Sequence, residues 1–389
     1  MKLLVVASRF PFPLQKGDKL RLYHQIRCLS EVAEIYLYTT STSDVKEKDI
    51  EELSKFCKAI KVHSMSQATM LGNITQSVLS SLPLQVGLFT TSKIKKEIEA
   101  FAKEHSIDHI YCQLARMAEN IKDLPYPKTI DYMDAFGFGM KRRAEMGGLL
   151  KRFIYTLEAK RMSRYETEIF NYFDHHTIIT DQDKTRMDLP AEKLTVVPNG
   201  VDTEYFKNRG GIMDYDIVFV GNMGYLPNID AAKMLVKKIL PKTNKKMNRN
   251  LSVLIAGARP SKEVIDLAKV EGVTIAGWME DIRSAYKNGK IFVAPIFKGI
   301  GQQNKILEAM SMEIPCIVNS HVALGLGLED GKNCLIADSE DAFVDKIIQL
   351  LEEPILYTNL LINGKELVLQ KFVWSKQTQS LAHLIGATS

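Results

Sequence analysis

The sequence predicts an α/β protein made of two doubly wound, Rossmann-like domains that face each other across a cleft. The length of 389 residues suggests two or three domains, since a domain takes about 150 residues. A hydrophobic content of 46% and a charged content of 25% are ordinary for a soluble globular chain and argue against wholesale disorder. Short apolar runs alternate with longer amphipathic segments, which is typical of parallel sheets covered by helices on both faces.

The first half contains six predicted strands and four predicted helices. Its first apolar run, residues 3–7, is shorter than a signal-peptide core of about 7–15 residues, so a buried strand is expected rather than a leader. The longest charge-free stretch, residues 64–92, is interrupted by polar residues and is not expected to span a membrane. The strands are residues 3–7, 35–38, 59–62, 109–112, 129–132 and 176–179, and the helices are residues 20–29, 49–57, 92–103 and 115–121.

The second half repeats this order after a polar stretch between residues 180 and 195. We therefore expect one domain over residues 1–185 and another over residues 186–371. Ligands of doubly wound sheets bind beyond the carboxyl ends of the strands, so functional residues are expected in the loops after strands and at the cleft between the domains. The strands are residues 194–197, 216–220, 251–256, 273–276, 291–294 and 315–318, and the helices are residues 228–239, 261–269, 281–287, 304–312 and 341–351.

One helical segment, residues 140–173, interrupts the alternation. Residues 141–164 carry eight positive and two negative side chains, a net charge of +6 in 24 residues. Five apolar residues recur in this segment at helical spacing and form one face: Leu149, Leu150, Phe153, Ile154 and Leu157. Such a helix either lies on an anionic membrane or ligand or packs by its apolar face onto its own domain, and the sequence leaves both alternatives open.

Several function classes are disfavoured by composition and by missing motifs. The net charge of +5 is too small for a dedicated nucleic-acid binder. The five cysteines match no zinc pattern and are expected to be free thiols in a reducing compartment, so a cytoplasmic location is predicted. The loop after the first strand contains only Gly17, not the GxGxxG pattern of a nicotinamide enzyme. A glycine turn before a helix is still a candidate anion site, because backbone N–H groups converge there.

The loop and helix formed by residues 295–310 are the richest region chemically. Gly299 and Gly301 allow the backbone to approach a ligand closely. Lys305 and the loop amides are suited to a diphosphate, and Glu308 lies one turn beyond Asn304, where a carboxylate can accept hydrogen bonds from two vicinal hydroxyls.

The order of several short motifs resembles the GT-B glycosyltransferases, specifically the retaining nucleotide-sugar transferases of glycosyltransferase family 4. The resemblance covers nearly the whole chain, and its N-terminal part looks like a branch associated with bacterial surface-polysaccharide synthesis. The motifs in the second half are residues 197–202, 218–221, 275–278, 305–312, 313–318 and 331–335, and those near the N-terminus are residues 9–14, 16–18 and 21–24.

The resemblance implies that the second domain binds the nucleotide sugar and that the first domain binds the acceptor. It implies that Glu308 binds the ribose, that Gly17 approaches the diphosphate from the first domain, and that residues 372–389 pack back onto that domain. The implied donor-binding residues are Gly17, Gly221, Asn222, Arg259, Gly277, Trp278, Lys298, Gly299, Ile300, Gly301, Asn304, Lys305 and Glu308.

This sequence departs from the family pattern at three places. Ile300 stands where the family has the first of two acidic residues. The loop at Asn222 lacks the two cationic residues with which many members of the family bind the donor diphosphate. Lys305 is the best substitute for them, and Lys298 or Arg259 is the next candidate. Arg116 lies in the loop where the family often has a histidine. Lys305, Arg116 and Asp134 are the candidate catalytic residues.

The implied reaction is transfer of a sugar, with retention, from a nucleoside diphosphate to a hydroxyl of a saccharide or lipid-linked saccharide. The implied pathway is cell-surface glycan synthesis. No metal or other cofactor and no nucleic-acid partner is expected, and peripheral contact with the inner face of the membrane is left open. Two alternatives remain, a catalytically silent GT-B subunit and a nucleotide-sugar epimerase.

Overall fold

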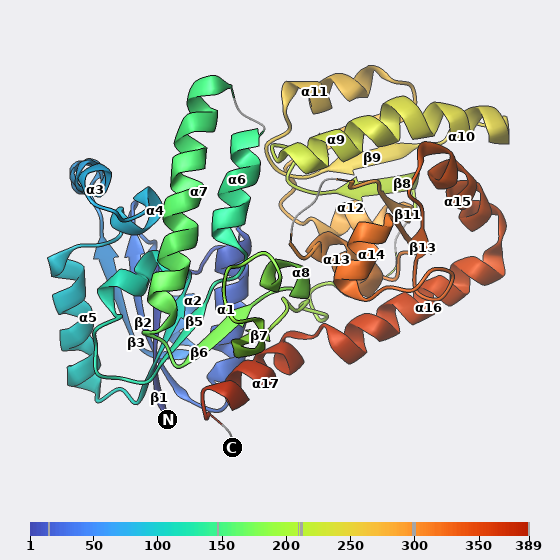
Figure 1. Cartoon of the computed structure of the whole chain (residues 1–389). Coiled ribbons are helices and arrows are strands. Elements are labelled where there is room, and N and C mark those ends of the chain that lie inside the picture. Colours follow the sequence, from blue (N-terminus) through green and yellow to red (C-terminus); the bar gives the residue numbers. More distant parts are fainter. Residues whose placement is uncertain (15, 146–147, 209, 211–212, 298–300, 388–389) are drawn as a thin grey trace. The chain divides into compact units, whose positions relative to one another are not determined.

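The computed structural model describes residues 1–14, 16–145, 148–208, 210, 213–297 and 301–387. The chain forms two compact units (Figure 1). Unit 1 comprises Met1–Pro198 and Trp374–Ser389, and unit 2 comprises Asn199–Val373. The boundaries lie at Pro198 and Val373, whereas the sequence analysis placed them at residues 185 and 371.

Unit 1 contains a seven-stranded parallel sheet in the order β3-β2-β1-β4-β5-β6-β7. The central strand β1 alternates between two cores, because successive side chains of a strand point to opposite faces. Leu4 and Val6 belong to one apolar cluster, and Leu3 and Val5 belong to the other. The strands are β1 (Lys2–Ala7), β2 (Glu34–Ser41), β3 (Cys57–Ser64), β4 (His109–Gln113), β5 (Lys128–Asp131), β6 (His175–Ile178) and β7 (Leu194–Val196).

The position of β7 corrects one expectation. Residues 194–197 were predicted to open the second domain, but Leu194 pairs with His176 of β6, so β7 is the last strand of the first sheet. The polar stretch predicted as the joint contains α8 (Asp181–Lys184) and connects β6 to β7 within unit 1. An apolar run indicates a strand, but it does not indicate which sheet that strand joins.

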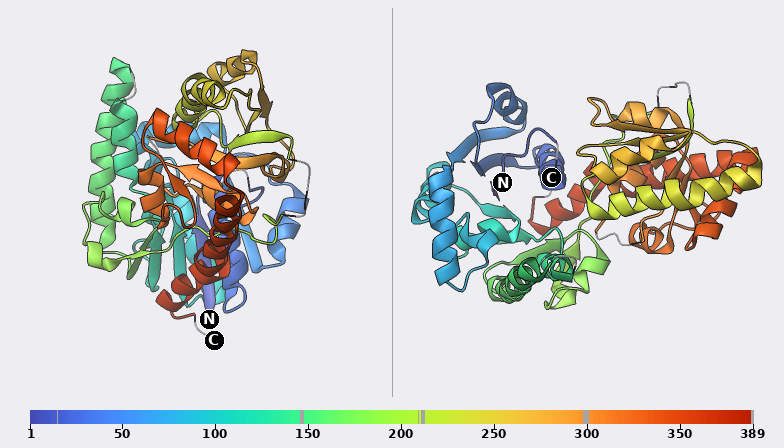
Figure 2. Two further views of the ribbon diagram at one scale, coloured as in Figure 1. Left: turned by 90° about the vertical axis from the view of Figure 1, so that its right-hand side faces the viewer. Right: turned by 90° about the horizontal axis from the view of Figure 1, so that it is seen from above.

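Helices cover both faces of the unit 1 sheet. On one face α1 and α17 pack with Leu22 and Leu381 in a shared cluster, and on the other α5 and α7 contribute Ile98 and Met162. The views in Figure 2 show the C-terminal end of the chain beside the N-terminal segment. The helices are α1 (Gly17–Leu29), α2 (Glu47–Ser54), α3 (Gln67–Leu79), α4 (Leu84–Gly87), α5 (Ser92–His105), η1 (Ala115–Asn120), α6 (Phe136–Glu145), α7 (Leu149–Phe170), α8, η2 (Ala191–Lys193) and α17 (Trp374–Leu384).

The segment predicted as one helical pattern, residues 140–173, contains the C-terminal part of α6 and the whole of α7. Its predicted apolar face is not packed onto unit 1: Leu149 is 89% exposed and Phe153 is 69% exposed. The helix packs instead through residues of its C-terminal half, such as Met162, Tyr165 and Ile169. In the part of the chain that the structure describes, no helix is long and apolar enough to cross a membrane.

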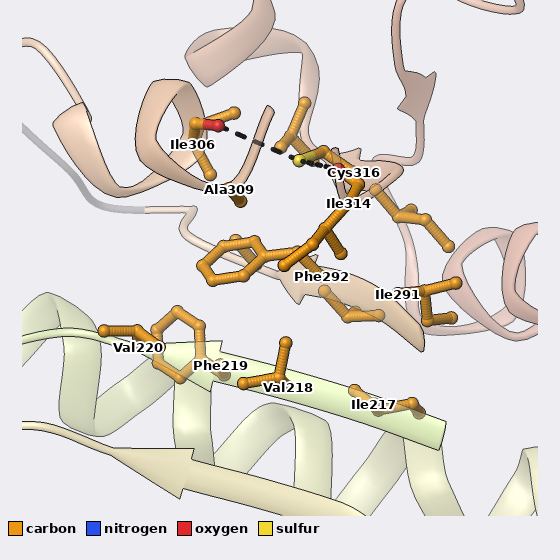
Figure 3. Close-up of a cluster of buried hydrophobic side chains, with 14 of the residues drawn as sticks. Ile217, Val218, Phe219, Val220, Ile291, Phe292, Ile306, Ala309, Ile314 and Cys316 are labelled. Atoms are coloured by element: carbon orange, nitrogen blue, oxygen red, sulfur yellow. Dashed lines mark hydrogen bonds between the residues drawn. The ribbon is translucent and has the colours of Figure 1, made fainter. Parts of the chain in front are cut away.

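Unit 2 contains a six-stranded parallel sheet in the order β10-β9-β8-β11-β12-β13. Figure 3 shows side chains of β8, β11 and α13 in its core, where the rings of Phe219 and Phe292 lie 6.1 Å apart. The strands are β8 (Tyr215–Val220), β9 (Val253–Ala256), β10 (Val273–Gly277), β11 (Gly289–Ala294), β12 (Cys316–Val318) and β13 (Leu335–Ile336). The helices are α9 (Leu226–Met234), η3 (Leu235–Ile239), α10 (Leu240–Met247), α11 (Lys262–Ile265), η4 (Asp266–Lys269), α12 (Arg283–Lys287), α13 (Asn304–Ser311), α14 (Ser320–Leu326), α15 (Glu340–Glu352) and α16 (Pro354–Lys371).

Each sheet has one point at which the strand order reverses. In unit 1 this switch point lies between β1 and β4, and in unit 2 between β8 and β11. The loops beyond the carboxyl ends of such neighbouring strands diverge and leave a crevice where ligands of doubly wound sheets bind. The topology therefore predicts that ligand-binding residues lie in the loops after these four strands.

Candidate active site

Three glycine-containing loops form one packed surface at the carboxyl edge of the unit 2 sheet. Gly257, after β9, has a φ of 136° and lies so close to the β8 loop that a Cβ atom would stand 1.7 Å from Gly221 O. The Gly257 amide donates to Gly277 O at 2.7 Å, and the Met223 amide donates to Ala258 O at 2.8 Å. Only glycine permits this backbone approach at residue 257, so the three loops are held in one arrangement.

Lys305 connects the two sides of the unit 2 switch point. It lies on α13, after β11, and its Nζ donates to Asn228 Oδ1 of α9 at 2.7 Å and to Gln303 Oε1 at 3.1 Å. Asn228 is itself held, because its Nδ2 donates to Asn222 O at 3.0 Å. The lysine ammonium therefore occupies a defined position between the β8 and β11 loops.

The charge of Lys305 is not balanced by a direct ion pair. Its two hydrogen-bond acceptors are neutral amide oxygens, and among the described residues no carboxylate lies within ion-pair distance of it. Burial lowers the pKa of Lys305 to about 8, against the opposing effect of Glu308. A buried cation with neutral partners is suited to receive an anionic ligand group.

Glu308 lies on the same side of α13 as Lys305, because residues three apart are neighbours on a helix. The other side of α13 is buried through Ile306 and Met310, which anchor the helix in the core. Glu308 Oε2 accepts a hydrogen bond from the buried Tyr286 hydroxyl at 2.7 Å. Burial raises the pKa of Glu308, while Tyr286 and Lys305 oppose this shift.

The structure places most of the predicted donor-binding residues around the same edge. Asn304 opens α13 and its buried Oδ1 has no partner in the described part of the chain. Gly301 has a φ of 70°, and the preceding residues Lys298, Gly299 and Ile300 lie outside the described residues. Trp278 follows β10 and is 66% exposed.

Arg259 and Gly221 complete that set. Arg259, exposed and with a φ of 56°, follows β9. Gly221 follows β8 and lies under Asn228, whose Nδ2 would be 2.9 Å from an added Cβ atom. Neither Arg259 nor Gly221 forms a hydrogen bond or ion pair with Lys305 or Glu308, so these residues have in common only the sheet edge at which they lie.

Sequence reasoning did not identify two residues that hold this site, Asn228 and Tyr286. Asn228 is buried at 3% exposure in the first turn of α9, and an asparagine just after the β8 loop was a weak signal for a loop-ordering role. Tyr286 is on α12 and meets Glu308 only through the fold. No pattern in the sequence links these two positions.

The three predicted residues of unit 1 follow its central strands. Gly17 begins α1, and an added Cβ atom there would meet no atom within 4 Å. Arg116 lies in η1 after β4, and Asp134 lies after β5 with an exposed side chain. Gly17, Arg116 and Asp134 are in unit 1, whereas Lys305 and Glu308 are in unit 2.

The comparisons with known proteins agree with this architecture. Residues 214–353 match the family model described as "Glycosyl transferases group 1". A protein of the cps region of Klebsiella pneumoniae, described as uncharacterized, is 21% identical over 89% of this chain and 90% of its own. An Escherichia coli UDP-Gal:alpha-D-GlcNAc-diphosphoundecaprenol alpha-1,3-galactosyltransferase is 24% identical over 45% of this chain and 51% of its own.

Solved structures match over almost the full chain. The sucrose-phosphate synthase of Thermosynechococcus elongatus superposes with a TM-score of 0.70 at 13% identity, covering 99% of this chain and 98% of that one. Anabaena HepE in complex with UDP and glucose gives a TM-score of 0.66 at 15% identity, with complete coverage of both chains. The chain is therefore a glycosyltransferase with the GT-B fold, and its second unit carries a group 1 glycosyltransferase domain.

Proposed function

We propose that this enzyme is a retaining glycosyltransferase of family 4 that acts in cell-surface glycan synthesis. It would transfer a sugar from a nucleoside diphosphate to a hydroxyl of a saccharide or lipid-linked saccharide. The observation that carries the proposal is the pairing of Lys305 with Asn228 across the unit 2 switch point, with Glu308 beside it. The names of the relatives support the substrate classes, since one is a transferase that uses UDP-Gal with a diphosphoundecaprenol-linked sugar and another lies in a cps region.

Unit 2 would bind the nucleotide through Glu308. Tyr286 occupies one carboxylate oxygen, Oε2, and no other hydrogen bond to the Glu308 carboxylate occurs among the described residues. The remaining acceptor capacity suits the two vicinal hydroxyls of a ribose. Trp278, largely exposed at the end of β10, would stack on the base, with Gly277 and Arg259 beside it.

Lys305 would stabilise the leaving group. When the sugar C1–O bond to the diphosphate breaks, negative charge grows on the phosphate oxygen, and a fixed cation lowers the energy of that state. The new bond would form between C1 and the acceptor oxygen on the same face, and the acceptor proton would pass to the departing phosphate. Lys305 then exchanges its amide partners for the diphosphate, and no metal or other cofactor takes part in this proposal.

The direct test measures nucleotide binding to the full chain and to Glu308→Gln. UDP, GDP, CDP and ADP are added in turn, and we expect one of them to raise the melting temperature of the wild type, because a ligand that binds only the folded state stabilises it. Glu308→Gln should bind that nucleotide at least about tenfold more weakly, a loss of about 1.4 kcal/mol. The Tyr286 hydroxyl can still donate to the new amide oxygen, so stability without ligand should change little.

The matched control is Glu352→Gln, which removes an exposed carboxylate from α15. It should bind the nucleotide like the wild type. If Glu308→Gln also binds like the wild type, Glu308 is not the ribose ligand; if none of the four nucleotides affects the wild type, the donor proposal itself fails.

We also propose peripheral contact with the inner face of the membrane through one surface of unit 1. This α7 surface consists of the exposed apolar residues of α7 together with those of α3, listed here: Leu149, Leu150, Phe153, Ile154, Leu157, Leu71, Ile74 and Val78. The two helices are adjacent, since Arg161 Nη1 of α7 donates to Ser77 O of α3 at 3.5 Å. Lys160 and Arg164 continue the stripe after Leu157 at helical spacing, so an anionic membrane surface would contact apolar and cationic groups on the same side of α7.

Binding to lipid vesicles tests the α7 surface. We expect the wild type to sediment with vesicles rich in phosphatidylglycerol, less at high salt, and weakly with pure phosphatidylcholine. Phe153→Ser should reduce the partition coefficient about three- to tenfold, because a large apolar side chain no longer leaves water. Ile355→Ser, which removes an apolar residue that is 79% exposed on α16 of unit 2, is the control and should leave binding unchanged. Equal binding by Phe153→Ser and the wild type would contradict the proposal.

A further inference from the structure

Two arginines leave the unit 1 sheet side by side at its switch point. Arg9 follows β1 and Arg116 follows β4, and these neighbouring strands are in register up to the pair Ala7 and Gln113. Ligands of doubly wound sheets bind at this position. The function proposed above assigns no ligand to either arginine.

Arg116 carries donors that the fold leaves unsatisfied. Its Nε and Nη1 atoms are buried and have no hydrogen-bond partner in the described part of the chain. Its guanidinium lies over the ring of Phe136, with the Cζ atom 5.2 Å from the ring centroid. The ring fixes the guanidinium by a cation–π contact but accepts no hydrogen bond from its edge. A buried charged donor without a hydrogen-bond partner is costly and rare in native proteins, and a bound anion is one partner that would satisfy it.

The charged groups around Arg116 do not neutralise it. Two carboxylates act on it, but Asp18 is already bound to Arg9 Nη1 at 2.6 Å, and Asp134 lies beyond ion-pair distance. Burial and then Arg9 lower the pKa of Arg116 to about 10, and Arg143 of α6 acts in the same direction. An anion beside the guanidinium would stabilise its charged form, against both the burial and the repulsion by neighbouring arginines.

The Asp18 side of the cluster is held in place independently. Gln113, at the end of β4, donates from Nε2 to Asp18 O at 2.8 Å, which ties the start of α1 to β4. Arg9 is therefore oriented by a fixed carboxylate, and its side chain remains 38% exposed. This leaves Arg9 able to reach a ligand that Arg116 has already bound.

We infer that Arg116, with Arg9 and Arg143 around it, forms a phosphate-binding site in unit 1. A guanidinium edge with two parallel N–H donors matches two oxygens of one phosphate group. The inference rests on the proposed function in one respect, which is that the phosphate belongs to a substrate of the transfer. We assign it to an acceptor that carries a phosphate or diphosphate, because unit 2 already has Lys305 for the donor.

Titration calorimetry with inorganic pyrophosphate tests the site directly. The full chain is used with Lys305→Gln, so that the candidate diphosphate site of unit 2 is disabled. Pyrophosphate should still bind, and adding Arg116→Gln should weaken that binding at least tenfold. Lys103→Gln, which removes an exposed cation from α5 of the same unit, should not weaken it. Unchanged binding after Arg116→Gln would overturn the inference.

The melting temperature without ligand separates a binding role from a structural one. Since Nε and Nη1 of Arg116 are buried without a hydrogen-bond partner among the described residues, Arg116→Gln should melt at the wild-type temperature or higher. Arg116→Lys keeps the charge but loses the two parallel N–H donors of the guanidinium. Its affinity for pyrophosphate should therefore lie between the affinities of the wild type and of Arg116→Gln. A large drop in melting temperature in both variants would instead indicate a structural arginine.

Steady-state kinetics identify the source of the phosphate. If it belongs to the acceptor, Arg116→Gln raises the KM of a phosphate-bearing acceptor at least tenfold and leaves nucleotide binding unchanged. If nucleotide binding weakens by a similar factor and the acceptor KM does not change, the site holds the donor diphosphate and the assignment to the acceptor is wrong. Since the pyrophosphate titration needs no nucleotide, it stands even if the donor proposal fails.

Discussion

Lys305 combines two properties at the level of the single residue. It is held by amide oxygens of Asn228 and Gln303, so its position is defined before a ligand arrives. Its charge is also destabilised by burial, which lowers its pKa to about 8. Preorganised charge of this kind is more effective in a partly dry site than in water, because little reorganisation accompanies the reaction.

The lowered pKa predicts a pH dependence. Below about pH 8 Lys305 is charged and able to bind the diphosphate, and above that pH it becomes neutral. The kcat/KM for the donor, which reports groups of the free enzyme, should therefore fall as the pH rises through about 8. Stopped assays across a pH series measure this.

Two variants of Lys305 make the pH prediction specific. Lys305→Arg should lose the fall above pH 8, because arginine stays charged, although its different shape will lower the rate. Lys305→Ala should lower turnover by roughly 10²-fold or more, as expected for removal of one transition-state donor, with a much smaller effect on folding. A wild-type profile that stays flat to pH 10 would show that Lys305 is not the titrating group.

At the level of elements, the loops after β8 and β9 depend on one backbone approach. Gly257 has a φ that L side chains rarely adopt, and a Cβ atom would lie 1.7 Å from Gly221 O. Gly257→Ala should lower the free energy of unfolding by roughly 2–4 kcal/mol, from strain and the forced separation of the loops. Urea denaturation measures the loss, and nucleotide binding should weaken as well.

Gly139→Ala is the control for that substitution. Gly139 lies inside α6, and an added Cβ atom meets nothing within 4 Å. Alanine should therefore leave stability unchanged or raise it by up to about 1 kcal/mol. Equal stabilities of Gly257→Ala and Gly139→Ala would contradict the close approach of the two loops.

Helix α7 shows how much a helical pattern leaves undecided. The spacing of Leu150, Ile154 and Leu157 predicted one apolar side, and that side exists. Whether it is covered depends on neighbouring elements, and unit 1 leaves it exposed. The same helix packs through a second apolar set near its C-terminal end, which the sequence pattern did not separate from the first.

At the level of the whole molecule, the chain passes from unit 1 to unit 2 and returns. Its last helix, α17, contributes to the core of unit 1 through Leu381, and Trp374 stacks on His24 with ring centroids 5.0 Å apart. Trp374 is 2% exposed. Unit 1 is therefore completed only by the last residues of the chain.

Trp374→Ala should destabilise unit 1 by about 3–5 kcal/mol, the usual cost of deleting a large buried aromatic side chain. Hydrogen exchange followed by mass spectrometry measures this by segment: amides of α1 and β1 should lose protection, and amides of β8 and β11 should not. The control, Gln379→Ala, changes an exposed residue of α17 and should affect neither unit. Equal loss of protection in β8 would contradict the assignment of α17 to unit 1.

The sequence by itself determined the two series of parallel strands and the placement of Lys305 and Glu308 on a helix after β11. These depend on local periodicity and on the position of loops after strands, which are written within short segments. The two units were predicted from this repeated series, whereas the GT-B fold and the glycosyltransferase activity were implied by the motifs that resemble the family.

Only the tertiary structure decided which sheet β7 joins, that Tyr286 meets Glu308, that Asn228 meets Lys305, and that Nε and Nη1 of Arg116 have no hydrogen-bond partner among the described residues. Each of these depends on contacts between residues far apart in the chain, and periodicity carries no information about such contacts. The same reason applies to the α7 surface, because a pattern identifies an apolar side but only the packed neighbours determine whether water reaches it.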